Sequence, residues 1–490
     1  MAETNPTTNP PAGYQPLSWW RAVLLALMAV VCFHAAYTPA LPGPWALAII
    51  GYVAGLIQLA RLRTTRQSFY AGLAVGFACG APQLIFFWKL FGAGAIALWL
   101  VLAFWTSVFV ALAHCALVRF GPMRGALLIP FLWTGLEYFR SELYYLKFSW
   151  LNVGYTLAEW PFMPIGILGM YGVGFAVVFF AVAIPAICRF LRQIEVSLIK
   201  LVFLVFLIAL FAAILLPGGS SRIRPANFVL AGVQLEFPTP DEIKMSLDKI
   251  ISAQANVPLK FYRASTNTDL IVLPEYTLDG EPTQELKDWC RENRKFLIVG
   301  GRDSSPGTNY FNTAFVISTN GEVVFKQVKC TPIQFFTDGL PATEQKVWES
   351  PWGKIGICIC YDFSYTRVTD ELVRQGAQML IVPTMDVADW GRHQHELHAR
   401  VAPVRAAEYG IPIFRVASSG ISQGVSRNGQ VQASAPFPGE GEILFFGAQL
   451  PPGRKGSLPL DRYLAPACVV VTGIFIVWLV VERLRRKKYA

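Results

Sequence analysis

Charged residues are scarce in this sequence. Only 15% of its 490 residues are Asp, Glu, Lys or Arg, whereas 54% are hydrophobic. Because soluble domains carry about 25% charged residues, this composition argues against an ordinary soluble enzyme. Most of the net charge of +10 falls in short loops and a tail beside long apolar runs. We therefore interpret it as a membrane-topology signal and not as a nucleic-acid-binding surface.

Cysteine and histidine are also few, and their spacing points to no disulfide framework or zinc site. The chain has nine cysteines and five histidines. His393, His395 and His398 lie with Glu396 in WGRHQHELHAR, where a helix would place His395 and His398 on one face. No further ligand cluster in the sequence completes a metal site there. We accordingly predict neither a metal nor a cofactor.

Long apolar runs are what the sequence has in excess. A helix that crosses a bilayer needs about 20 apolar residues. Loops rich in Lys and Arg, such as RLRTTR at 61–66, fall on one side if there are eight spans. The positive-inside rule then predicts cytoplasmic termini and an extracytoplasmic segment between spans seven and eight. The predicted spans are 21–36, 42–60, 68–88, 94–117, 125–139, 161–187, 198–217 and 463–481.

The chain divides into five predicted parts. Residues 1–18 are polar and Pro-rich, which predicts a disordered leader before a retained first span. Residues 19–217 hold seven predicted transmembrane helices, and 222–450 have the composition of a globular domain. A linker at 451–462 leads to 463–490, a last transmembrane helix with a basic cytoplasmic tail.

The globular segment alternates strand-like and helix-like stretches. NFVLAGVQLEF is strand-like and precedes a helix-compatible run, and the pair Asn320–Gly321 has the signature of a hairpin turn. Such alternation predicts a layered α/β domain with helices covering its sheets.

Two cysteines flank one isoleucine in GKIGICICYDFSY, residues 353–365. A strand through 355–359 would point Cys358 into the packing between layers and present Cys360 where the strand ends. Spacing therefore favours Cys360 as a reactive thiol and Cys358 as core. Taken alone, such a pair is more often buried and inert.

A nucleophilic thiol needs a base and a cation that stabilises the oxyanion. LIVLPEY places Glu275 at the end of a hydrophobic strand, and VFKQVKCTPIQFF offers Lys326 and Lys329 in a strand-to-loop passage. Each is weak evidence alone, but the order Glu, Lys, Cys is more specific.

That order, with LPEY around Glu275 and ICICYD around Cys360, resembles the nitrilase superfamily, whose members use a Glu–Lys–Cys triad on an αββα sandwich. The resemblance covers about 226–440 and assigns Glu275 as general base and Cys360 as nucleophile. The family pattern K-x-x-L-V-P-F aligns best on KCTPIQF, which assigns Lys329 to the oxyanion, with Lys326 as the alternative.

A nitrilase-like domain between transmembrane spans resembles the apolipoprotein N-acyltransferase family. Three further stretches are similar to that family: LEYFRSELYYLKFSWLNVGYTL, GILGMYGVGF and RVAPVRAAEYGIPIFRVASSGIS. The chain departs from the family pattern at QFFTD, where Thr337 and Asp338 replace a usual Glu, and at Ser418–Ser419, which replace an Asn pair. Asp338, Tyr361 and Asp362 are therefore candidate supporting residues, and the resemblance suggests a structural role for His398.

The resemblance implies an enzyme of the bacterial inner membrane with a periplasmic catalytic domain. It would transfer an acyl chain from a phospholipid, through a thioester on Cys360, to the N-terminal amine of diacylglyceryl-cysteine apolipoproteins. The alternatives are a membrane-anchored amidohydrolase of nitrilase type and an inactive scaffold. A transporter is disfavoured because no span carries paired charges at its centre.

Overall fold

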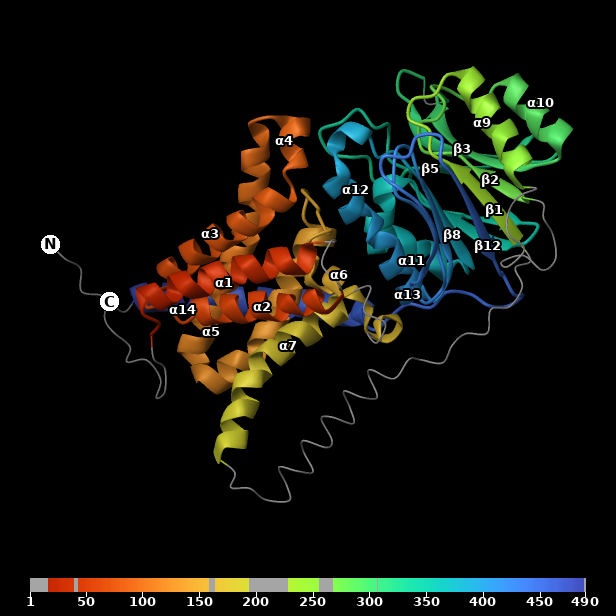
Figure 1. The fold of residues 1–490 in the computed structure, drawn as a ribbon. Coiled ribbons are helices and arrows are strands. Elements are labelled where there is room, and N and C mark those ends of the chain that lie inside the picture. Colours follow the sequence, from red (N-terminus) through yellow and green to blue (C-terminus); the bar gives the residue numbers. More distant parts are fainter. Residues whose placement is uncertain are drawn as a thin grey trace.

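A bundle of apolar helices lies beside a two-sheet α/β domain (Figure 1). This computed structural model describes residues 16–38, 43–157, 164–193, 228–254, 268–305 and 307–488. The predicted leader, apart from its last residues, and the predicted span at 198–217 lie outside the described residues.

The bundle is built from the apolar runs that the sequence analysis identified. Four described helices are long and apolar enough to cross a membrane, namely Trp19–Tyr37, Gly94–Leu143, Ile165–Ala183 and Asp461–Arg486, and Trp45–Leu59 is a shorter apolar helix. This supports several membrane segments but does not confirm the count of eight. The elements are α1 (Trp19–Tyr37), η1 (Gly43–Leu47), α2 (Ala48–Leu59), α3 (Thr65–Gln83), α4 (Phe86–Phe91), α5 (Gly94–Tyr138), η2 (Phe139–Leu143), α6 (Val153–Thr156), α7 (Ile165–Gln193) and α14 (Asp461–Lys488).

The predicted spans 94–117 and 125–139 both lie in α5, which reverses direction at Gly121. Gly121 has φ +80°, a conformation that glycine adopts without a Cβ clash, and Pro122 follows it. The rings of Phe109 and Trp133 lie 4.8 Å apart, as expected for two antiparallel segments packed together.

Two six-stranded sheets form the α/β domain. The first has the order β12 (Ile443–Ala448), β1 (Phe228–Val233), β2 (Leu270–Val272), β3 (Phe296–Asp303), β4 (Phe311–Ile317), β5 (Val323–Val328). The second has the order β11 (Val431–Ala435), β10 (Ser422–Val425), β9 (Ile413–Ala417), β8 (Met379–Thr384), β7 (Gly353–Ile357), β6 (Val347–Ser350). In each sheet three neighbouring strands run parallel: β1, β2 and β3 in the first, and β7, β8 and β9 in the second.

The two sheets pack face to face, with helices on their outer faces. A Cβ on Gly232 of β1 would lie 2.6 Å from Val416 of β9, and one on Gly424 of β10 would lie 2.4 Å from Phe446 of β12, so both glycines let the sheets approach closely. The first sheet is covered by α9 (Pro240–Ala253) and α10 (Gln284–Asn293) (Figure 1). The second faces α11 (Thr366–Arg374), α12 (Arg392–Ala399) and α13 (Val401–Tyr409). The predicted layered α/β architecture is thus confirmed as an αββα sandwich.

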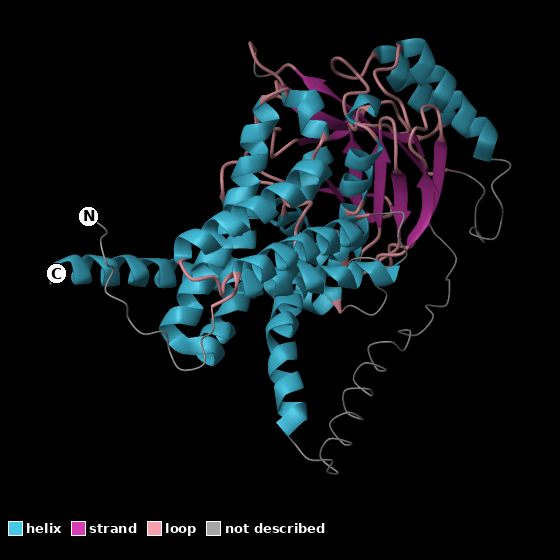
Figure 2. Ribbon diagram, turned by 60° about the vertical axis from the view of Figure 1, so that its left-hand side comes forward, coloured by secondary structure: helices cyan, strands magenta, loops and turns pink. Residues whose placement is uncertain are grey.

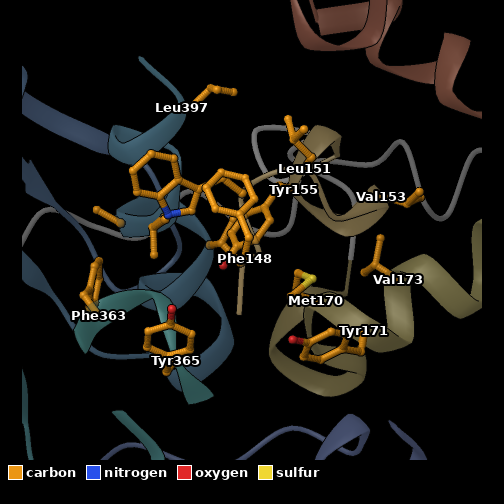
Figure 3. Close-up of a cluster of buried hydrophobic side chains, with 14 of the residues drawn as sticks. Phe148, Leu151, Val153, Tyr155, Met170, Tyr171, Val173, Phe363, Tyr365 and Leu397 are labelled. Atoms are coloured by element: carbon orange, nitrogen blue, oxygen red, sulfur yellow. The ribbon is translucent and has the colours of Figure 1, made fainter. Parts of the chain in front are cut away.

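The strands and helices of the sandwich and the helices of the bundle occupy separate regions (Figure 2), and buried side chains join them. Phe148 and Leu151 precede α6, and with Met170 of α7 they belong to the same buried cluster as Phe363 and Leu397 of the α/β domain (Figure 3). Beside this cluster, the backbone N–H of Met170 donates to the Glu408 carboxylate at 2.7 Å. Both apolar packing and a buried polar contact therefore position the bundle against the second sheet.

Candidate active site

Cys360 lies just beyond the end of β7, at the first residue of the short helix η5 (Cys360–Ser364). The strand ends at Ile357, two residues earlier than predicted. The backbone N–H of Cys358 still donates to the carbonyl of Ile381, and the chain then turns into η5. Cys360 has φ +50°, which is uncommon for a residue with a side chain. Its thiol donates to the carbonyl of Met385 at 3.7 Å. Cys358 is fully buried in the core, as the spacing predicted.

Glu275 and Lys329 meet at the same edge of the sandwich. Glu275 follows β2 and Lys329 follows β5, and the Lys329 Nζ lies 2.8 Å from Glu275 Oε1. The N–H of Met385 donates to Glu275 Oε2 at 2.9 Å. Met385 therefore contacts both the thiol and the carboxylate, so the structure brings Glu275, Lys329 and Cys360 together.

Asp338 completes the charge balance around Lys329. Its Oδ2 lies 2.7 Å from the Lys329 Nζ. The side-chain amide of Asn312 donates to Glu275 at 2.7 Å and to Asp338 at 2.8 Å. One buried ammonium is thus held between two buried carboxylates that share an amide donor.

Lys326, the alternative lysine, lies outside this cluster. Its Nζ pairs with Asp303 at 2.9 Å and Glu281 at 3.6 Å, and 40% of its side chain is exposed. The alternation of β5 explains the difference, because positions 326 and 329 fall on opposite faces.

Burial and neighbouring charges set the protonation states. Burial raises the pKa of the Cys360 thiol well above its usual value, and Glu275 raises it further. Burial also raises the pKa of Glu275, against the opposing effect of Lys329. Burial alone would lower the pKa of Lys329, but Glu275 and Asp338 outweigh it and raise the pKa. The resting site therefore holds a protonated thiol and a charged ammonium beside a carboxyl group that can accept a proton.

Two family models match the chain. The apolipoprotein N-acyltransferase N-terminal domain matches residues 31–183, and the carbon-nitrogen hydrolase domain matches residues 256–446. The apolipoprotein N-acyltransferase of Geobacter metallireducens is 25% identical over 85% of this chain and 87% of its own length. That of Shewanella oneidensis is 24% identical over 84% of this chain and 88% of its own. The chain is thus similar to two apolipoprotein N-acyltransferases over most of its length.

Among solved structures, Nit3 of Saccharomyces cerevisiae, a member of branch 10 of the nitrilase superfamily, is also similar. It is 22% identical, with a TM-score of 0.38, over 48% of this chain and 93% of its own length.

Asp362 and Tyr361 support the site from η5. The Asp362 carboxylate accepts the N–H groups of Cys330 at 2.8 Å and Thr331 at 2.6 Å, which fixes the chain that follows Lys329. The Tyr361 hydroxyl donates to the carbonyl of Lys147 at 2.9 Å, linking η5 to the segment between η2 and α6.

Sequence reasoning missed Asn312 and Asp386. Nothing around Asn312 in NYFNTAF marks it as a site residue, because its role appears only when β4 lies beside Glu275. Asp386 follows β8 in IVPTMD, much as Glu275 follows β2, and that parallel could have identified it. Its carboxylate, a ring nitrogen of His398 and the Cys360 sulfur lie within 4.8 Å of one another. Because the carboxylate already pairs with Arg415, it is a poor ligand for a cation.

An apolar cavity of about 120 Å³ lies between the bundle and the α/β domain. Its lining includes Trp150, Tyr361, which follows Cys360 in the sequence, and Phe335 and Phe336 of the QFFTD loop. The rings of Phe335 and Phe336 pack against the ring of Phe91 in α4, with ring centroids 5.9 and 5.7 Å apart.

Proposed function

We propose that this chain transfers a fatty acyl chain from a phospholipid to the N-terminal amine of diacylglyceryl-cysteine apolipoproteins. The observation that carries the proposal is the Glu275–Lys329–Cys360 cluster. It lies in a chain whose membrane half matches the N-terminal domain of apolipoprotein N-acyltransferases and whose catalytic half matches carbon-nitrogen hydrolases. The relatives from Geobacter and Shewanella bear the name of this activity.

The first half-reaction forms a thioester. Glu275 takes the proton of the Cys360 thiol, and the sulfur attacks the ester carbonyl of the phospholipid. Lys329 and the backbone N–H of Tyr361 stabilise the oxyanion; one such donor contributes about 10²–10³ in rate. When the carbon–oxygen bond breaks, Glu275 returns the proton to the glycerol oxygen. The products are an acyl-enzyme and a lysophospholipid.

The second half-reaction forms an amide. The amine of the diacylglyceryl-cysteine attacks the thioester carbonyl, a carbon–nitrogen bond forms and the carbon–sulfur bond breaks. One proton leaves the nitrogen and one returns to the sulfur, so the free thiol is regenerated.

The apolar cavity is suited to the acyl chain of the donor. Most of the side chains in its wall are aromatic or aliphatic and come from both bodies, and Tyr361 among them is adjacent in sequence to the nucleophile. Burial of each methylene there contributes about 0.8 kcal/mol, so a long chain gains binding energy that a short one lacks.

We also propose the membrane arrangement that the charge pattern predicts: eight spans, cytoplasmic termini and an extracytoplasmic catalytic domain in the inner membrane. The apolar helices of the bundle support the membrane location. The orientation can be tested with a single cysteine introduced into the basic tail of the protein. A membrane-impermeant thiol reagent added to intact cells should not label it.

A defined acyl donor and acceptor test the activity. Purified protein would be incubated with a phospholipid carrying an isotopically labelled acyl chain and a diacylglyceryl-cysteine peptide. Mass spectrometry should find the labelled acyl group on the peptide amine, and not on a peptide whose amine is acetylated. Release of free fatty acid at the same rate without peptide would favour the amidohydrolase alternative. No turnover of either kind by folded protein would favour the inactive scaffold.

A further inference from the structure

Leu102 of α5 lies between two cavities. It is one of the lining residues of the apolar cavity, about 120 Å³ in volume, between the bundle and the α/β domain. A second cavity of about 60 Å³ lies among α1, α2, α3 and α5, and Leu102 lines it too. Of the consecutive residues Trp150 and Leu151, the former lines the first cavity and the latter the second. The buried Leu102 side chain is therefore part of the wall between the two spaces.

The second cavity differs from the first in charge. Glu137 and Arg140 line it, and both belong to LEYFRSELYYLKFSWLNVGYTL, a stretch to which the reaction described above gives no role. The Glu137 carboxylate accepts the N–H of Val153 at 2.9 Å, and the Arg140 guanidinium donates to the side chain of Asn152. Hydrocarbon that entered this space would lie against two charged groups and offer neither of them a hydrogen bond, which is unfavourable.

The position of the nucleophile fixes the direction in which an acyl chain occupies the apolar cavity. Tyr361, which follows Cys360, and Gln394 line the cavity from the α/β domain, and the Gln394 amide donates to Asp386 at 3.0 Å. Because the ester carbonyl has to reach Cys360, it belongs on this side. The hydrocarbon then runs away from it toward the bundle, where α5 contributes Leu102.

We propose that Leu102 is the floor of the acyl-binding cavity and sets the length of the acyl chain that the protein transfers, with Glu137 and Arg140 as the barrier behind it. This assignment rests on the proposed function and names the determinant of its donor specificity. A chain that ends before Leu102 leaves a void and loses dispersion contacts. A chain that is too long has to displace Leu102 toward the charged residues.

Competition among donors measures the chain-length profile. Purified protein would be incubated without an amine acceptor in detergent micelles that contain an equimolar mixture of phospholipids with one headgroup and different acyl-chain lengths. Intact-protein mass spectrometry at early times gives the distribution of acyl masses on Cys360, and so the relative kcat/KM for each length. Because all donors compete for the same protein, this distribution does not depend on the folded fraction. We expect one maximum, with a fall of about tenfold for each additional carbon beyond it.

Two substitutions of Leu102 should move that maximum in opposite directions. Leu102→Ala removes three carbons from the floor, so the maximum should move to chains about two carbons longer. An upper limit should remain, because Glu137 and Arg140 still line the space behind. Leu102→Phe should move the maximum to chains about one carbon shorter. Leu100→Ala is the matched control on α5, since Leu100 is 44% exposed and lines neither cavity, and its profile should match the wild type.

Each outcome decides the assignment. A maximum at the wild-type length in the Leu102 variants overturns it, as does a loss of acylation that is equal at all chain lengths. A Leu102→Ala profile without an upper limit contradicts the barrier formed by the charged residues. Since the two variants have opposite expected shifts, either one suffices if the other does not fold. A wild type that takes up all lengths equally refutes this inference alone, whereas a folded wild type that takes up none refutes the proposed function.

Discussion

Lys329 is the residue on which the charge balance of the site depends. Replacing it with methionine leaves Glu275 and Asp338 buried without their counter-charge, which should destabilise the protein by about 3–5 kcal/mol. Acylation of Cys360 should also slow by at least about 10²-fold, because an oxyanion donor is lost. Thermal unfolding in detergent and the acylation rate of the folded fraction measure the two effects.

Lys326→Met is the control for that prediction. Its ammonium is partly exposed and pairs with the exposed Glu281 and the buried Asp303. The free energy of unfolding should change by about 1 kcal/mol, less than in Lys329→Met, because solvent screens this pair, and acylation should be unaffected. Loss of acylation in Lys326→Met with retention in Lys329→Met would show that the wrong lysine has been assigned.

Asp362 should impose a pH dependence on stability. Burial raises its pKa from 3.8 to about 6, so the folded state binds this proton more tightly than the unfolded state. Wild-type stability should therefore fall relative to Asp362→Asn as pH rises from about 4 to 6. Melting temperatures of both proteins across this range provide the test, and a difference that rises or stays constant with pH would contradict it.

At the scale of elements, the contact between β7 and α11 positions the nucleophile. A Cβ on Gly356 would lie 2.7 Å from Leu380 Cδ2 and 3.1 Å from Leu372 Cβ. Gly356→Ala should therefore destabilise the protein by about 1–3 kcal/mol and displace the strand end that carries Cys360. Gly473→Ala in α14, where a Cβ meets nothing within 4 Å, should be neutral or slightly stabilising. Equal melting temperatures for the two variants would refute this account of the packing.

Strand ends were the part of the site that the sequence could reveal. Glu275 and Cys360 each follow a short apolar run that is recognisable as a strand, and the family motifs selected Lys329 over Lys326. Asn312 and the pairing of Asp386 with His398 depend on which strands become neighbours, and local sequence carries little of that information. The two arms of α5 could be predicted as two apolar runs, but the position of the turn at Gly121 could not.

At the scale of the whole molecule, the cavity between the two bodies links membrane location to substrate choice. Phe335 and Phe336 are exposed on the loop that lines it. Replacing both with serine should raise the KM for long-chain phospholipids several-fold, because less apolar surface contacts the chain. The rate of acylation by a short-chain soluble ester should stay the same. An equal loss with both donors would place these residues in the chemistry and not in chain binding.

The helices of the membrane half could be predicted from composition and hydropathy. The runs at 21–36, 94–117, 125–139 and 463–481 correspond to α1, the two arms of α5, and α14. How these helices pack on the catalytic domain, through Phe148 and Trp150, follows from tertiary contacts that hydropathy does not encode.

The central claim is that Cys360 carries the acyl group. Intact-protein mass spectrometry after incubation with a defined phospholipid and no amine acceptor tests it most directly, with Cys360→Ala and Cys358→Ala measured in parallel. The account predicts an added acyl mass that hydroxylamine removes, present in the wild type and in Cys358→Ala and absent in Cys360→Ala. An adduct that survives in Cys360→Ala, or no adduct in folded wild-type protein, would contradict it.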